Sequence, residues 1–156
     1  MQPKIQQPPK ASILLKKLRP NAQMPEYATE GSAAADLYAA LEAPCTIEAG
    51  GRAVIPTGIA LALPDAGYAA LVFARSGLAV KHGLALSNGV GVIDSDYRGE
   101  ISVGLVNLSD EPYTVQMGER IAQLCIFPVA RALFTVTETL DETKRGAGGF
   151  GSTGRG

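Results

Sequence analysis

The sequence predicts an all-β fold, a sandwich or barrel built from short strands. No window of the chain shows a sustained helical period. Short runs rich in valine, isoleucine and leucine recur instead, and turn-forming residues separate them at close spacing. This pattern is typical of sandwiches and barrels, because each strand needs only a few residues to cross the core.

A series of segments has the composition of strands, and turn sequences such as Pro64-Asp65-Ala66-Gly67 and Met117-Gly118-Glu119 lie between them. In chain order, the expected strands cover residues 13–18, 36–40, 45–48, 52–63, 68–74, 84–87, 99–108, 113–116, 120–129 and 132–140. We expect a flexible stretch over residues 1–11, one β domain over residues 12–140 and a flexible arm over residues 141–156.

Two expected strands are informative because side chains alternate between the faces of a strand. Over residues 99–108, Ile101, Val103 and Leu105 share one face, which predicts one buried side. Over residues 120–129 apolar side chains occupy both faces, so another layer or another subunit is expected to cover the second face. Gln123 is the amide in that strand and needs a partner, either a neighbouring loop or a ligand; spacing alone favours the loop.

Composition places the chain among soluble globular proteins, with 46% apolar residues in a length sufficient for one domain. A formal net charge of −1 gives no reason to expect a nucleic-acid polymer or an anionic membrane as partner. No stretch reaches the roughly 18 apolar residues of a membrane span, and MQPKIQQPPK lacks the apolar core of a secretory signal. Cys45 and Cys125 form no metal-binding or disulfide pattern, which favours a reducing, cytoplasmic setting.

Four polar islands interrupt the strand pattern, at residues 31–39, 74–83, 88–100 and 145–156. In the second, Arg75-Ser76-Gly77 offers a guanidinium, a hydroxyl and exposed backbone amides, a set suited to phosphate oxygens. An ordinary turn at a strand end is the simpler interpretation of that tripeptide alone. The fourth island combines arginine, serine and threonine with a glycine-rich backbone, so it is either an inert tail or an arm that orders with a ligand.

The third island predicts a β-hairpin, because Asn88-Gly89 and Ser95-Asp96 both have turn chemistry. Asp94 follows an apolar run, so we expect a partly desolvated carboxylate, which is suited to act as a general base on water. Asp96 is expected in the bend, so the two acids do not converge. Tyr97 is either a core residue or a ring that stacks on a sugar.

Together with GERIAQLCI (118–126), the four islands resemble, in order, the five motifs of trimeric dUTP diphosphatases, which hydrolyse dUTP to dUMP and pyrophosphate. The resemblance covers residues 28–156. It implies a distorted, barrel-like jelly roll that assembles as a homotrimer with composite active sites and a flexible glycine-rich arm. It also implies dUTP as substrate, Mg²⁺ as cofactor, and neither a nucleic-acid polymer nor a membrane as partner. Ala34 and Ala74 depart from the family's usual glycine and proline, and neither change removes a chemical group.

The resemblance also implies roles for individual residues. Asp94 matches the general base that acts on the attacking water, and Asp36 matches the acid that helps to hold Mg²⁺ through water. Tyr97 matches the ring that stacks on deoxyribose and leaves no room for a 2′-hydroxyl. Asn88 and the backbone of Val92 and Ile93 match the uracil-reading positions. The other implied substrate-binding positions are Arg75, Ser76, Gly77, Ser102, Gln123, Arg145, Phe150, Gly151 and Ser152. The match makes phosphate the favoured partner of Gln123.

Two other functions fit parts of the sequence. A dCTP deaminase shares the implied architecture, but its chemistry on the base is expected to use a glutamate where this chain has Asp94 followed by Tyr97. A non-enzymatic β-sandwich with an RNA-binding arginine–glycine tail is the second alternative. The low number of arginines and aromatic residues in the tail and the absence of a basic excess argue against it.

Overall fold

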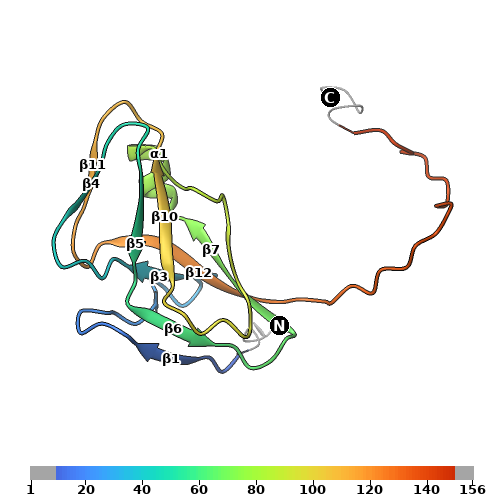
Figure 1. The fold of residues 1–156 in the computed structure, drawn as a ribbon, viewed down its shortest axis with the longest axis horizontal. Coiled ribbons are helices and arrows are strands. Elements are labelled where there is room, and N and C mark those ends of the chain that lie inside the picture. Colours follow the sequence, from blue (N-terminus) through green and yellow to red (C-terminus); the bar gives the residue numbers. More distant parts are fainter. Residues whose placement is uncertain (1–9, 150–156) are drawn as a thin grey trace, which may run out of the picture.

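The computed structural model describes residues 10–149, and within them almost all regular structure is β-strand (Figure 1). The strands are β1 (Leu14–Lys17), β2 (Glu26–Tyr27), β3 (Ala35–Tyr38), β4 (Cys45–Ile47), β5 (Arg52–Pro56), β6 (Ile59–Ala62), β7 (Tyr68–Ala74), β8 (Leu84–Leu86), β9 (Gly91–Ile93), β10 (Ser102–Asn107), β11 (Tyr113–Val115) and β12 (Arg120–Pro128). One helix, α1 (Ser76–His82), follows β7. The predicted all-β class is confirmed, with this single short helix added.

The strands pair antiparallel in four sheets, in the orders β1-β6, β5-β10-β8, β11-β4 and β2-β3-β12-β7-β9. Neighbours within a sheet are often far apart in sequence: β12 lies between β3 and β7. In Figure 1, β5 and β10 run across the direction of β1 and β6, so the sheets wrap around a common interior. Long crossing connections between antiparallel strands are the arrangement of a jelly roll.

The interior is filled by aliphatic side chains from all four sheets. Ile55, Ile59 and Val115 have no exposed surface, and Leu105 and Ile121 are 1% exposed. On β10 the predicted inward face is confirmed, because Val103 and Leu105 are buried while Ser102 is exposed. Burial of each such side chain stabilises the fold by about 1.5–3 kcal/mol.

Residues 52–63, predicted as one strand, form two strands that belong to different sheets. Thr57 and Gly58 separate β5 from β6, and Gly58 adopts a left-handed backbone with φ of 71°. Ala22, Arg19 and Ala40 pack around Gly58 so closely that an added Cβ would lie 2.7 Å from the Cβ of Ala22. The prediction was wrong because the apolar run resumes directly after Pro56-Thr57-Gly58, so a turn inside one long run was not recognised.

Helix α1 lies in the polar island over residues 74–83, where a turn was the simpler interpretation of Arg75-Ser76-Gly77. Leu78 is its only buried residue, so the helix shows no apolar period, and seven residues are too few to establish one. The helix ends at Gly83, which has φ of 67° and donates its N–H to the carbonyl oxygen of Ala79. The sequence analysis also did not predict strand β2, because two residues are too few to show an alternating pattern.

The strand predicted over residues 132–140 is absent. The paired strands end with β12, and the chain then runs away from the rest of the protein without a strand or helix up to residue 149 (Figure 1, orange to red). Leu133, Phe134, Val136 and Leu140 are between 84% and 100% exposed. The apolar pattern of a strand is therefore present, but within residues 10–149 no other strand pairs with it.

No helix of the described residues is long and apolar enough to cross a membrane.

Replacing Gly58 by alanine tests the crowded left-handed turn. We expect Gly58→Ala to lower the free energy of unfolding by about 2–4 kcal/mol, from left-handed backbone strain plus overpacking. Gly50 is the matched control, because it has φ of 72° and no atom within 4 Å of an added Cβ. Gly50→Ala should cost only about 1–2 kcal/mol in urea unfolding at equal protein concentration. Equal losses in the two variants would contradict the packing argument.

Candidate functional site

Strand β7 divides the predicted site residues between the two faces of the five-stranded sheet. Successive side chains of a strand point to opposite faces, and residues paired across a ladder point to the same face. Val72 is paired with Gly91 on β9, whereas the next residue, Phe73, is paired with Gln123 on β12. Gln123 is in turn paired with Asp36 on β3. Each face of the sheet borders one pocket, which we call the β9 pocket and the β12 pocket.

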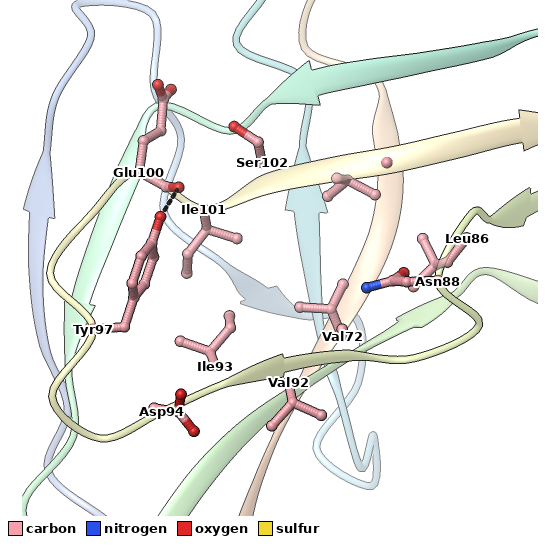
Figure 2. Close-up of a pocket in the computed structure, with 13 residues that line it drawn as sticks. Val72, Leu86, Asn88, Val92, Ile93, Asp94, Tyr97, Glu100, Ile101 and Ser102 are labelled. Carbon is pink, nitrogen blue, oxygen red and sulfur yellow. Dashed lines mark hydrogen bonds between the residues drawn. The ribbon is translucent and has the colours of Figure 1, made fainter.

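The β9 pocket is a hollow of about 230 Å³ beside the edge strand β9 (Figure 2). It collects six predicted site residues, all of them between Asn88 and Ser102. Its lining consists of Val72, Leu86, Asn88, Gly91, Val92, Ile93, Asp94, Tyr97, Glu100, Ile101, Ser102, Val103 and Gly104. In Figure 2 the side chains of Asn88 and Ile93 point into the hollow, whereas that of Val92 points away from it.

The predicted hairpin over residues 88–100 is wrong in one respect. Its first arm is strand β9, but β9 is paired with β7 and not with the second arm, which contains no strand. The predicted bend at Ser95-Asp96 is confirmed, because the N–H of Tyr97 donates to the carbonyl oxygen of Asp94 at 3.1 Å and closes a turn over those residues. β9 is therefore an edge strand whose second edge has no partner strand among residues 10–149.

Asp94 stands where the chain leaves the buried interior. Ile93 is 9% exposed, but the Asp94 side chain is exposed in the single chain. The expected partial desolvation of this carboxylate is therefore not supplied by its own subunit. A bound ligand or a second chain would have to exclude water from it.

Tyr97 is held at both ends of its side chain. Its backbone belongs to the turn that begins at Asp94, and its hydroxyl donates to the carbonyl oxygen of Glu100 at 3.0 Å. The ring remains 45% exposed, so it is not the core residue considered as one alternative. Figure 2 shows the ring standing beside the Asp94 carboxylate at one end of the hollow.

Glu100 was not among the predicted site residues, although it lines the β9 pocket and fixes its rim. Its carboxylate accepts from Arg19 Nε at 2.6 Å and Nη2 at 3.0 Å, and from the N–H of Gly58 at 2.9 Å. The hydrogen bond from Arg19 holds the pKa of Glu100 below its ordinary value. This pair has no signal in the sequence, because 81 residues separate Arg19 from Glu100.

The β12 pocket, of about 480 Å³, lies on the other face of the sheet and collects the predicted phosphate-binding residues. Its lining consists of Ala28, Ser32, Ala33, Ala34, Asp36, Phe73, Arg75, Ser76, Gly77, Arg120, Gln123 and Cys125. No atom lies within 4 Å of a Cβ built on Gly77, so this residue faces open space.

Burial raises the pKa of the Cys125 thiol, which donates to the carbonyl oxygen of Ala33, so this cysteine is not an activated nucleophile.

Asp36 forms the centre of a charged cluster in the β12 pocket. Its carboxylate accepts from Arg75 Nε at 2.9 Å and from Arg120 Nη1 at 3.1 Å, and Asp36 itself is 8% exposed. Two guanidinium groups share one carboxylate, so the cluster keeps an excess of one positive charge. Arg75 also donates from Nη1 to the backbone oxygen of Arg120 at 3.1 Å, which leaves its Nη2 available to a ligand.

Arg120 was missed as a site residue even though it belongs to the quoted motif GERIAQLCI. Its contact with Asp36 depends on the pairing of β12 with β3, whose register shifts between Arg120 and Ala122. A register irregularity of this kind re-aims side chains, and it cannot be seen in a single sequence.

Gln123 makes a structural hydrogen bond, as its spacing favoured, but the partner is the last residue of β7 and not a loop. Its Nε2 donates to the backbone oxygen of Ala74 at 2.8 Å. The other N–H of this amide remains for a ligand in the β12 pocket. Beside it, α1 begins at Ser76 without a side-chain cap, so the first amides of the helix have no side-chain acceptor.

The described residues do not form a metal cage. Within residues 10–149 no group of three or more histidine, cysteine, aspartate or glutamate side chains could hold an ion. Asp36 is the only carboxylate that lines the β12 pocket, and both of its oxygens accept from arginines. These residues fit a magnesium ion that is held mainly by phosphate and water, and they do not fit a resident ion held by protein ligands.

Of the predicted site residues in the arm, Arg145 is the one that the structure describes, and it lines neither pocket. Arg145 donates from Nε to the backbone oxygen of Gly148 at 2.9 Å and contacts neither pocket in the single chain. Phe150, Gly151 and Ser152 lie outside the described residues.

Comparison with known proteins decides the family. A family model described as dUTPase matches residues 20–154. The chain belongs to the dUTPase family. The resemblance seen in the five motifs is thereby confirmed.

Individual relatives agree with the family model. The deoxyuridine 5'-triphosphate nucleotidohydrolase of Desulfitobacterium hafniense is 58% identical over 132 residues, which is 85% of this chain and 87% of the relative. That of Idiomarina loihiensis is 51% identical over 143 residues and covers 92% and 95% of the two chains. The solved structure of Staphylococcus bacteriophage 80alpha dUTPase with dUPNHPP has a TM-score of 0.83 at 29% identity and covers 92% of this chain and 98% of that chain.

The Arg19–Glu100 pair predicts a specific dependence of stability on pH. Because the folded-state pKa of Glu100 lies below the unfolded value of 4.5, the pair stabilises the protein above that pH and less as the pH falls through the lowered pKa. Glu100→Gln should therefore be less stable than wild type at about pH 6, and the gap should narrow below about pH 4.5. Urea midpoints across this range measure the gap. Glu48→Gln, at an exposed glutamate, is the control and should show no such closing gap.

Proposed function

We propose that the protein hydrolyses dUTP to dUMP and pyrophosphate by attack of water on the α-phosphorus. In a cell this reaction keeps uracil out of DNA and supplies dUMP for dTMP synthesis. The observation that carries the proposal is the sorting of the predicted residues into two pockets, one with Asn88, Asp94 and Tyr97 and one with the charged cluster around Arg75. Membership of the dUTPase family supports the substrate.

The β9 pocket binds the nucleoside. An edge strand has backbone N–H and C=O groups without a ladder partner, and a pyrimidine can pair with such groups as it pairs with another base. β9 is the edge strand of its sheet, and Val92 and Ile93 supply its backbone groups beside the Asn88 amide. Tyr97 stacks on the deoxyribose, and Ser102 completes the lining of the pocket.

Asp94 acts as the general base. It orients and deprotonates the water that attacks the α-phosphorus, and the proton passes to its carboxylate while the bond to the departing pyrophosphate breaks. The side chain is exposed in the single chain, so the bound nucleotide and the neighbouring subunit supply the desolvation that this role needs.

The β12 pocket binds the phosphates. Arg75, through its available Nη2, with Ser76, Gly77 and the second N–H of Gln123, neutralises the charge that develops on the leaving pyrophosphate. Magnesium bound with the nucleotide supplies Lewis-acid stabilisation of the phosphate oxygens. Asp36 would hold that ion through water, while its direct contacts keep Arg75 oriented.

The two pockets belong to different subunits of a homotrimer in this proposal. They border opposite faces of one sheet, which supports a site in which one nucleotide contacts Asp94 of one chain and Arg75 of another. The outer face of the sheet has half-buried or exposed apolar side chains, including Phe73, Phe127 at 40% and Val92 at 65% exposure. The sequence predicted that β12 is covered on both faces, and a second subunit on this face would provide that cover.

The segment that follows β12 also needs a partner. Its apolar side chains are almost fully exposed in the single chain, which is costly in water. We propose that residues 141–156 form an arm that reaches another subunit and closes its site with Arg145, Phe150, Gly151 and Ser152. The last twelve residues can span roughly 40 Å at about 3.3 Å each.

Cys45 and Cys125 are both free thiols, which supports the predicted cytoplasmic setting.

Release of pyrophosphate from dUTP, UTP, dTTP and dCTP tests the reaction and its alternatives. We expect rapid release from dUTP with magnesium and much slower release from the other three nucleotides. Ammonia released from dCTP would support a deaminase instead. Salt-sensitive retention of RNA without hydrolysis of any nucleotide would support the RNA-binding alternative.

Asp94→Asn tests the general base. The amide keeps the shape of the side chain but cannot take a proton, so kcat should fall by about 10²–10⁴-fold while nucleotide affinity changes little. Asp96→Asn is the matched control, because Asp96 lies two residues away in the bend and does not line the β9 pocket. Near-normal turnover by Asp94→Asn would refute its role.

A chain that ends at Lys144 tests the arm. Without the closing residues the site stays open to water, and we expect turnover to fall by about a hundredfold while the trimer remains assembled. Light scattering measures the assembly, and pyrophosphate release measures turnover. Full turnover by the shortened chain would show that the arm does not close the site.

A further inference from the structure

Gly99 lies against the ring of Tyr97. A Cβ added to Gly99 would lie 2.6 Å from Cζ of Tyr97 and 3.0 Å from Cε2, and closer still to the hydroxyl oxygen. Real Cβ atoms essentially never come within 3.0 Å of such atoms. The hydroxyl end of the tyrosine therefore occupies the space that any side chain at position 99 would need.

Backbone conformation does not require glycine at this position. The glycines with left-handed φ among the described residues are Gly50, Gly58, Gly83, Gly89, Gly118 and Gly146, and Gly99 is not one of them. Alanine can therefore adopt the backbone of residue 99 without strain. The three atoms nearest to an added Cβ all belong to the side chain of Tyr97.

The surroundings of Tyr97 fix the ring in this place. Its hydroxyl donates to the backbone oxygen of Glu100, whose carboxylate is held by Arg19 and by the N–H of Gly58. Its own N–H is bonded to the carbonyl oxygen of Asp94. The ring rests on Gly99, so a methyl group there would push its hydroxyl end away from Glu100 and from its present place at the end of the β9 pocket.

We propose that Gly99 is a specificity-determining residue: its missing side chain sets the position of the Tyr97 ring and so the clearance available at the 2′ position of the sugar. This inference rests on the proposed function, in which the ring stacks on deoxyribose. A ring displaced by Gly99→Ala leaves the sugar less closely packed. The variant admits a 2′-hydroxyl that the wild-type pocket excludes.

The experiment compares dUTP with UTP for wild type, Gly99→Ala and Gly67→Ala. Gly67 is the matched control, because its added Cβ also meets the end of a side chain, Asp65 Oδ1 at 2.9 Å, without a left-handed φ and outside both pockets. For Gly99→Ala we expect the ratio of kcat/KM for dUTP to that for UTP to fall at least about tenfold, the size of effect that one methyl group has on a fitted pocket. Gly67→Ala should keep the wild-type ratio.

A double variant separates an effect through Tyr97 from any other effect. Once Tyr97→Ala has removed the ring, adding Gly99→Ala should change the dUTP-to-UTP ratio by less than about twofold, because the two positions act through one contact. Dissociation constants for imido-bridged dUTP and UTP analogues give the same comparison without turnover. A tenfold further change in the double variant would overturn the proposal.

The remaining outcomes are also decisive. An unchanged ratio in Gly99→Ala overturns the proposal, and so does loss of folding in Gly99→Ala when Gly67→Ala remains folded. Failure of the wild-type protein to hydrolyse dUTP contradicts the proposed function instead. In that case the analogue affinities still show whether Gly99 controls recognition of the sugar.

Discussion

The alternation of side chains along β7 determines where each part of the site can lie. Val72 and Phe73 are consecutive, yet one borders the β9 pocket and the other borders the β12 pocket, because neighbouring side chains of a strand point to opposite faces. Residues paired across the ladder keep this division: Gly91 of β9 lies on the face of Val72, whereas Gln123 of β12 and, through it, Asp36 of β3 lie on the face of Phe73. A single chain therefore separates the residues proposed to bind base and sugar from those proposed to bind phosphate, which is why the proposed site is shared between two chains.

The β9 pocket and the β12 pocket also differ in their charge. The β9 pocket contains two carboxylates, but Glu100 is neutralised by Arg19 and Asp94 has no ion-pair partner among the described residues. The β12 pocket has the opposite balance, since Asp36 offsets only one of its two arginines. This difference in charge supports the proposed roles, in which the second pocket attracts the triphosphate and the unpaired acid of the first acts on water. Asp36 also restrains the long side chain of Arg75 before any ligand arrives, which lowers the entropy lost on binding.

The sequence was sufficient for the family and for most strands, because strand patterns and motif order are local properties. The inward face of β10 follows directly from the alternation of Ile101, Val103 and Leu105. The features that the sequence did not predict depend on contacts between residues that are distant in sequence. Arg120 reaches Asp36 only through the register of β12 on β3, and α1 is buried through Leu78 alone. Residues 132–140 have the pattern of a strand but no partner strand within the described part of the chain.

Glu100 connects the stability of the fold to the shape of the site. Its side chain binds Arg19 and the amide of Gly58, the glycine whose left-handed turn separates β5 from β6. Its backbone oxygen, on the opposite side of the same residue, receives the hydroxyl of Tyr97. A change at the turn between two core strands is therefore transmitted through one residue to the ring beside Asp94. The rim of the β9 pocket can be rigid although Tyr97 is half exposed, because the groups that hold it are themselves anchored in the core.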